Sequence, residues 1–215
     1  MSPEPTGFPG PEGVPHRQFA NAYEQGTPAW CIGRPQPVVL EILDRGWLAN
    51  GPLLDAGCGT GQNLIEIAGR HPEMRGLGVD SVPAAVRSAE EGVLQAGLGK
   101  RVETEVADLR MGVPPGPFQT ILDAGVLHVF SDHDRRRYLS GVVESLLPGG
   151  EFVVVVFSDA EIRGGGPRRM GREELKAALV EAGLEVLEIE ACRYWTTSWD
   201  DGAAAWLGRS RRPDA

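Results

Sequence analysis

The stretch "LLDAGCGTGQN", residues 53–63, places three glycines at alternate positions directly after an apolar run that ends in an aspartate. A continuous apolar run is typical of a parallel strand that is buried on both faces. Glycine permits positive φ and lets a ligand approach the backbone without a Cβ in the way. A helix beginning near Gly61 would add free N–H groups and a partial positive charge. We therefore expect a ligand to lie against Gly57, Gly59 and Gly61.

The alternation of apolar runs with helical patterns continues on both sides of this stretch. Repeated strand and helix units joined by short loops predict an α/β fold with an open, doubly wound sheet. The expected strands are residues 52–56, 75–80, 102–107, 118–124 and 151–157, and the helices between them are residues 61–71, 82–97 and 132–147. Two further helices, residues 16–26 and 37–47, are expected before the first strand.

The two ends of the chain depart from this alternation. After a helix over residues 171–183, the runs 184–195 and 203–210 read as two strands joined by the loop 196–202, which predicts an antiparallel hairpin. Residues 1–15 are rich in proline and glycine, so a disordered arm is expected there. No internal repeat is visible, and residues 16–215 are expected to form one domain.

Composition and charge restrict the partners. The net charge of -9 argues against nucleic-acid binding, which needs clustered cations. The three cysteines, Cys31, Cys58 and Cys192, lack CxxC spacing, which favours free thiols in a reducing cytoplasm over disulfides or a metal site. The N-terminus lacks the features of a signal peptide, and no apolar run reaches the roughly 20 residues of a membrane span. We expect a soluble cytoplasmic protein, either a monomer or a homodimer.

The spacing of the glycines restricts the ligand. A dinucleotide-binding loop has the pattern G-x-G-x-x-G, whereas this loop reads G-x-G-x-G and follows Asp55. A carboxylate there would repel a pyrophosphate and would suit a ligand with an ammonium or sulfonium group. Asp80 ends the second strand, where a carboxylate can accept both hydroxyls of a ribose, and Asp108 follows the third, where an adenine amino group could donate to it. Each aspartate alone could equally be a helix cap.

Taken together, these motifs resemble the class I S-adenosylmethionine-dependent methyltransferases over residues 52–158. The matching segments are "LLDAGCGTG", "GVD", "VADL", "ILDAGVLHVF" and "LLPGG". The resemblance implies a Rossmann-like, seven-stranded, mostly parallel sheet with a C-terminal hairpin, and S-adenosylmethionine as cofactor. It implies that Gly57 to Gly61 meet the methionine and ribose, and that Asp80 with Ser81, and Asp108 with Leu109, hold the adenosine.

Three other segments are similar to a subgroup near the thiopurine and heterocyclic toxin methyltransferases, which act on small molecules. These segments are "PAWCIGRPQP", "LHVFSD" and "FSDAEIRGGGPRRM". The first belongs to residues 16–36, which the resemblance makes a lid over the site. The subgroup carries Trp-Asp where this chain has Trp30-Cys31, so a lid carboxylate is lost. We do not transfer its role to Cys31, because a buried thiol is more often inert packing.

Methyl transfer from a sulfonium mainly requires alignment of the reacting atoms and exclusion of water. Aromatic side chains serve both purposes and can lie against the sulfonium. The candidates are Tyr23, Trp30, Tyr194, Trp195 and Trp199, although Trp195 and Trp199 are equally expected to pack in the core or at an edge.

Several charged or titratable residues are candidates for further roles in the site. Arg34 could pair with the carboxylate of the donor or with one in the lid, and Asp123, which ends the fourth strand, could orient the donor or simply hold a loop. Arg168 and Arg169 could meet an anionic acceptor. The other histidines, His16, His71 and His133, read as surface residues.

His128 is the candidate general base, together with Tyr23 as a second catalytic residue. It follows the fourth strand, at the rim where an acceptor would lie, and its usual pKa range suits proton removal. The alternative is a histidine that bonds a backbone carbonyl or caps the next helix. A thiol acceptor, already partly ionised near neutrality, would need little help from a base.

The sequence thus predicts an enzyme that transfers a methyl group to O, S or N of a small molecule, such as a secondary metabolite or a toxic aromatic compound. One alternative is cyclisation or elimination of the same donor. Others are a nucleoside-binding module without chemistry and, as the weakest, a nicotinamide oxidoreductase.

Overall fold

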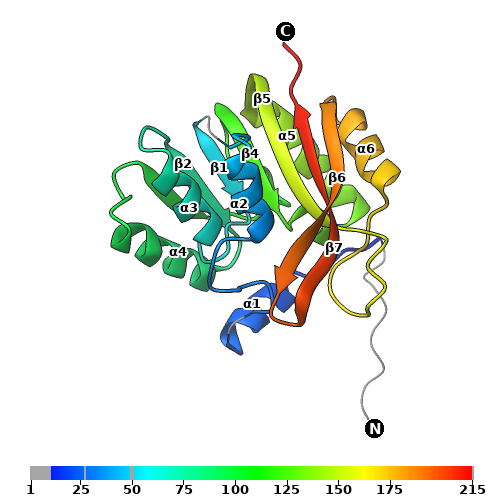
Figure 1. Ribbon diagram of the computed structural model, residues 1–215, viewed down its shortest axis with the longest axis horizontal. Coiled ribbons are helices and arrows are strands. Elements are labelled where there is room, and N and C mark those ends of the chain that lie inside the picture. Colours follow the sequence, from blue (N-terminus) through cyan, green and yellow to red (C-terminus); the bar gives the residue numbers. More distant parts are fainter. Residues whose placement is uncertain (1–10, 27, 49–50, 215) are drawn as a thin grey trace.

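A computed structural model describes residues 11–26, 28–48 and 51–214 of the chain, and its centre is one seven-stranded sheet (Figure 1). The strand order is β3-β2-β1-β4-β5-β7-β6. All pairs are parallel except those of β7, which runs antiparallel to both β5 and β6. The strands are β1 Leu53–Ala56, β2 Gly76–Asp80, β3 Val102–Val106, β4 Phe118–Ala124, β5 Leu146–Phe157, β6 Glu185–Thr196 and β7 Trp199–Arg211.

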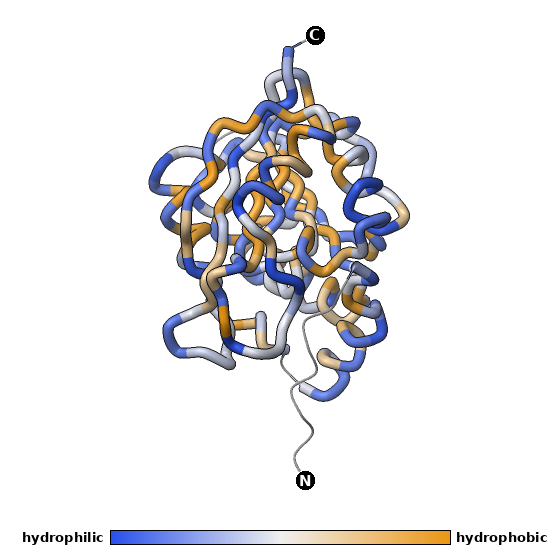
Figure 2. Tube along the Cα trace, turned by 90° about the vertical axis from the view of Figure 1, so that its right-hand side faces the viewer, coloured by the Kyte–Doolittle hydropathy of each residue, from blue (hydrophilic) through white to orange (hydrophobic). Residues whose placement is uncertain are grey.

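Helices cover both faces of the sheet (Figure 1). They are α1 Arg17–Glu24, α2 Pro37–Asp44, α3 Gln62–Arg70, α4 Pro83–Gln95, α5 Asp132–Ser145 and α6 Arg172–Glu181, with a 3₁₀ turn η1 Leu127–Val129. In β5, Val153 and Val155 pack into the core under α2 and α3, whereas Val154 and Val156 pack into the core under α5 and α6. A strand with helices on both sides must be apolar at every position. Figure 2 accordingly shows the hydrophobic segments concentrated in the interior of the molecule.

This architecture confirms the predicted fold class, including the antiparallel C-terminal hairpin. Most boundaries lie within three residues of the prediction, and the starts of β5 and β7 differ by more. Leu146 and Leu147, expected in a helix, begin β5, because the residue before Pro148 is held away from helical geometry. β7 begins at Trp199 rather than at Ala203, so the hairpin loop is much shorter than residues 196–202.

The expected disordered arm is wrong for residues 11–15. The carbonyl of Pro11 accepts from the N–H of Asp132 at 3.0 Å, and the N–H of Val14 donates to the carbonyl of Val129 at 2.8 Å. These bonds fix the segment against the turn after β4. The rest of the expected arm, residues 1–10, lies outside the described residues.

The carboxyl ends of the parallel strands meet at one edge, where ligands of doubly wound sheets bind. In Figure 1 this is the lower edge, and α1, the tip of the β6–β7 hairpin and the loop after β5 gather there. The strand order reverses between β1 and β4, which places the switch point beside the glycine loop. None of the helices in the described ranges is long and apolar enough to span a bilayer.

Candidate functional site

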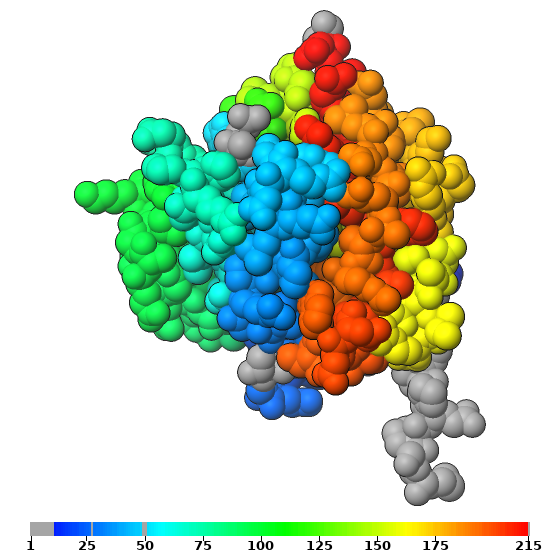
Figure 3. Space-filling view, viewed as in Figure 1, coloured from blue at the N-terminus to red at the C-terminus, as the bar shows by residue number. Residues whose placement is uncertain are grey.

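A cavity of about 850 Å³ opens at this edge of the sheet. One part, which we call the carboxylate half, is lined by Gly57, Gly59, Asp80, Ser81, Asp108, Leu109 and Arg110. The other part, the aromatic half, is lined by Phe157, Gly164, Gly165, Gly166, Pro167, Tyr194, Thr196, Ser198 and Trp199. The N-terminal segment, residues 11–36, contributes Phe19, Tyr23 and Trp30 to the same cavity. In the space-filling view of Figure 3, α1, the hairpin tip and the loop after β5 crowd this lower edge.

The glycine loop forms the floor of the carboxylate half. Gly57, Gly59 and Gly61 have φ of 72°, 54° and 80°, a region that favours glycine. A Cβ on Gly57 would lie 2.1 Å from Cγ2 of Val126, and one on Gly61 would lie 3.0 Å from Cβ of Ala89. The loop therefore needs glycine for its backbone angles, and Gly57 also needs it for space.

Asp80 lies at the end of β2 and faces this loop. Its Oδ2 accepts from the N–H of Gly59 at 3.0 Å, and its Oδ1 accepts from the N–H of Val82 at 2.9 Å. Burial raises the pKa of the carboxyl above its ordinary value. Each oxygen of the Asp80 carboxylate can accept a second hydrogen bond, so the two oxygens together can still accept from two hydroxyls of a ligand.

Asp108 has a partner that the sequence analysis did not find. Nε and Nη2 of Arg110 donate to its Oδ1 and Oδ2 at 3.0 Å and 2.6 Å, and the N–H of Arg110 donates to Oδ1 at 3.0 Å. The guanidinium lowers the pKa of Asp108, so the carboxylate stays ionised. The sequence signal for this bidentate ion pair was the i, i+2 spacing of Asp108 and Arg110 at the end of a strand.

Four of the expected cofactor residues do not line the cavity. Asp123 lies behind the cavity, fully buried, and accepts from the N–H groups of residues 125, 126 and 127 at 2.7–3.1 Å. These bonds favour the alternative in which Asp123 holds the loop after β4. Asp55 is 1% exposed, and burial followed by the charges of Asp123 and Asp80 raises its pKa to about 7. Gly61 is buried at the start of α3. Arg34 is exposed, with Cζ 5.5 Å from the ring centroid of Trp195.

His128 lines the cavity but is bound to backbone. Its Nδ1 accepts from the N–H of Phe157 at 2.8 Å, and a hydrogen bond to the backbone of Gly125 engages the ring as well. Burial, followed by the charge of Arg169, lowers its pKa from 6.5 to about 3. A neutral ring fixed by two backbone groups is a structural bridge between the ends of β4 and β5. These bonds favour the backbone-bound alternative for His128 over the general base.

The N-terminal segment closes over the glycine loop. The hydroxyl of Tyr23 lies 3.5 Å from Sγ of Cys31 and accepts from Nε1 of Trp30 at 3.4 Å, and the two rings meet edge to face. The same hydroxyl lies 3.3 Å from the position of a Cβ on Gly59. Burial raises the pKa of both Tyr23 and Cys31, so hydroxyl and thiol stay protonated. Cys31 is thus a neutral packing group of the N-terminal segment.

The far end of this segment is tied to β6. The side-chain amide of Gln36 donates to the carbonyl of Trp195 and accepts from its N–H, both at 2.9 Å. The N–H of Gln36 in turn donates to Oδ1 of Asn63 on α3 at 2.9 Å. Trp195 therefore serves through its backbone, and it does not line the cavity.

The aromatic half is a cluster of rings from β5, β6 and β7. The ring centroid of Phe157 lies 5.6 Å from that of Tyr194 and 6.1 Å from that of Trp199. The two arginines expected to meet an anionic acceptor have other partners. Arg168 pairs with Asp132 and Glu174, and Arg169 donates to backbone carbonyls of its own loop.

The comparisons with known proteins agree with this geometry. The family model of a methyltransferase domain matches residues 53–150. A 2-heptyl-1-hydroxyquinolin-4(1H)-one methyltransferase of Mycobacteroides abscessus is 31% identical over 183 residues, which are 84% of this chain and 73% of the relative. This chain belongs to the class I S-adenosylmethionine-dependent methyltransferases.

Two other known proteins are similar to this chain over most of its length. A probable thiol methyltransferase of Arabidopsis thaliana is 27% identical over 80% of this chain and 75% of its own length. A solved structure described for the conversion of a disulfide bond into a thioacetal group in echinomycin biosynthesis superposes with a TM-score of 0.78, at 27% identity and 92% coverage of both chains. S-adenosylmethionine is the cofactor of this methyltransferase.

Proposed function

We propose that the enzyme transfers the methyl group of S-adenosylmethionine to an O, S or N atom of a small, ring-bearing molecule. The observation that carries this proposal is the continuity of the cavity, which joins a carboxylate half to an aromatic half. The substrates named for its relatives, a hydroxyquinolinone and thiols, support a small acceptor. No nucleic-acid acceptor is proposed for a chain with a net charge of -9.

The carboxylate half fits the donor. Gly57 and Gly59 line this half with bare backbone, which lets the methionine and ribose approach without a Cβ in the way. Asp80 would accept the ribose hydroxyls, and Asp108, with Ser81 and Leu109 alongside, would accept the adenine amino group. When bound, the donor supplies an electrophilic methyl group on a sulfonium.

The chain contributes alignment and exclusion of water rather than proton removal. Tyr23 and Trp30 cover the glycine loop, and Phe157, Tyr194 and Trp199 wall the space beyond it. Nδ1 of His128 accepts from the backbone N–H of Phe157, and Tyr23 stays protonated. We infer that the preferred acceptors carry a nucleophile that is ionised near neutrality, such as a thiol or an acidic hydroxyl.

A product assay with isotope-labelled donor tests the proposal. The panel contains thiophenol, ethanethiol, 4-nitrophenol and 1-hydroxyquinolin-4-one, and both the methylated acceptor and the nucleoside product are measured. The proposal expects methylated acceptor and S-adenosylhomocysteine in equal amounts. Release of methylthioadenosine would indicate cyclisation or elimination instead. Donor binding without turnover on any acceptor would favour a nucleoside-binding module.

We also propose a cytoplasmic location. Cys31, Cys58 and Cys192 are all free in the structure, which supports the cytoplasmic location that the sequence predicts. Mass measurement of the native protein would decide between monomer and homodimer.

A further inference from the structure

Glu161 is a buried carboxylate in the loop between β5 and α6. Its side chain is 3% exposed. Oε1 accepts from Nε and from the backbone N–H of Arg163 at 2.7 Å and 2.9 Å, and Oε2 accepts from Nη2 of Arg163 at 2.6 Å. Oε2 also accepts from the N–H of Ala204 on β7 at 2.9 Å. The carboxylate therefore fixes both the arginine and the adjoining strand.

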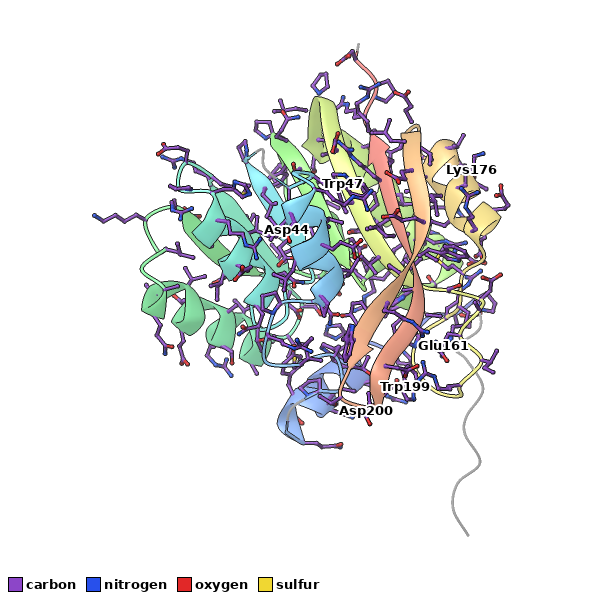
Figure 4. The ribbon with its side chains drawn as sticks, viewed as in Figure 1. Asp44, Trp47, Glu161, Lys176, Trp199 and Asp200 are labelled. Atoms are coloured by element: carbon purple, nitrogen blue, oxygen red, sulfur yellow. The ribbon has the colours of Figure 1, made fainter. Side chains whose placement is uncertain are left out.

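Arg163 carries this contact to the tip of the β6–β7 hairpin. Its Nη1 donates to Oδ1 of Asp201 at 2.6 Å, and Nη2 donates to the carbonyl of Gly202 at 2.7 Å. Its Cζ lies 4.6 Å from the ring centroid of Trp199, which is the geometry of a cation–π contact. Figure 4 shows Glu161 on its loop beside Trp199 on the hairpin tip.

Trp199 is thereby held between two groups. Arg163 lies over its ring, and the ring of Phe157 packs against it with an interplanar angle of 46°. Trp199 and Phe157 both line the cavity, whereas neither Glu161 nor Arg163 does. The ion pair can therefore affect an acceptor through the tryptophan, which it contacts and which lines the cavity.

We propose that Glu161 and Arg163 are positioning residues that fix Trp199 as a wall of the aromatic half, and so favour acceptors with a planar ring. The inference rests on the proposed methyl transfer and adds a determinant of acceptor choice. An Arg in a bidentate pair that also stacks on an aromatic face has a fixed plane, which a lysine or a neutral side chain cannot reproduce. Loss of that plane frees the indole to leave its place in the wall.

The test compares Arg163→Met with Arg193→Met. Arg193 is a matched control, because it also reaches Asp201 and the carbonyl of Gly202, at 3.8 Å and 3.4 Å, without bonding Glu161. For Arg163→Met we expect the KM for thiophenol to rise about tenfold, while the Kd for S-adenosylhomocysteine stays within about twofold. For Arg193→Met both constants should stay within about twofold. Equal effects of the two variants, or an equal change in the Kd, would overturn the proposal.

A second comparison guards against misfolding, because Arg163→Met leaves a buried carboxylate without its cation. Glu161→Gln alone should raise the KM for thiophenol by about threefold, and the double variant should be no worse than Arg163→Met. If the effects of the two substitutions on the KM were additive in the double variant, Glu161 and Arg163 would not act as one unit. If the wild-type enzyme methylates no acceptor at all, the proposed function fails. If it turns over normally and the variants keep its KM, only the positioning role fails.

Discussion

The two halves of the cavity differ in how the chain builds them. The carboxylate half comes from the ends of β1, β2 and β3, and each residue sits within a few positions of its own strand. The aromatic half joins the end of β5 and the loop after it to the tip of the β6–β7 hairpin. The first half depends on local backbone geometry, whereas the second depends on contacts between distant segments. Changes in the first should therefore affect the donor, and changes in the second should affect the acceptor.

The largest effect is expected for Gly57→Ala. The new Cβ would meet Val126 and would also require positive φ, so we expect a loss of roughly 2–5 kcal/mol in unfolding free energy and no measurable donor binding. Gly97→Ala is the control, because Gly97 has φ of 71° with open space around it and should cost only about 1–2 kcal/mol. Thermal denaturation and calorimetry measure both. Normal donor affinity in Gly57→Ala would contradict the role of bare backbone.

Asp80→Asn tests the carboxylate half directly. Replacing a charged acceptor that holds the Gly59 N–H should raise the Kd for S-adenosylhomocysteine by about 10- to 100-fold. The KM for the acceptor should change little when the donor is saturating. Asp44→Asn on α2 (labelled in Figure 4) is the control, since this side chain is 72% exposed and pairs only with Arg70 at the surface. An equal change in both constants would show that the two halves are not separable.

His128→Gln tests whether His128 acts as a general base. Glutamine can also accept from Phe157 and donate to Gly125, so we expect less than about a tenfold loss of kcat/KM, against the 10²–10⁴-fold typical of a lost general base. The pH profile of kcat/KM should keep its shape. A larger loss together with a missing inflection would restore His128 as the base.

His128 also makes the unfolding free energy depend on pH. Its pKa falls from 6.5 to about 3 on folding, so the unfolded chain binds the extra proton between these values. Wild-type stability should therefore decrease as the pH falls below about 6.5, by at most about 1.4 kcal/mol per pH unit from this group. The difference in unfolding free energy between wild type and His128→Gln should become smaller as the pH falls from 6.5 to about 3.

The smallest effect is expected for Tyr23→Phe, at the boundary of the two halves. The ring and its contact with Trp30 remain, and only the hydroxyl that bonds Trp30 and Cys31 is lost. We expect about a three- to tenfold decrease in kcat/KM, without a change in the pH profile, because the hydroxyl is not ionised. Steady-state kinetics at several pH values measure it. A decrease confined to alkaline pH would instead assign Tyr23 a proton-transfer role.

The contrast between the halves also explains how much the sequence could predict. The glycine loop and Asp80 directly follow apolar runs, and Asp108 follows the alternating segment VETEVA, so their place at the carboxyl edge follows from the predicted strands. Asp55 and Asp123 follow the same pattern, yet they lie behind the cavity. Whether a strand-end carboxylate faces a ligand or its own loop depends on one residue of register and on the following turn.

The aromatic half was predictable only as a set of residue types. The sequence identified Tyr194 and Trp199 as candidate aromatics, but Phe157 reads as one more apolar residue of a buried strand. The bonds of Arg163 to Asp201, of Glu161 to Ala204 and of Gln36 to Trp195 join segments that no local pattern relates. His128 shows the same limit, because the strand geometry that binds its ring to Phe157 is tertiary.

A crystal structure of the enzyme with S-adenosylhomocysteine and thiophenol bound would test the division of the cavity most directly. We expect the nucleoside to lie against Gly57, Gly59 and Asp80, with its sulfur turned toward Phe157 and Trp199. The acceptor sulfur should lie about 3–4 Å from the position of the transferred methyl group, in line with the donor sulfur. A nucleoside bound elsewhere, or an acceptor outside the aromatic half, would contradict it.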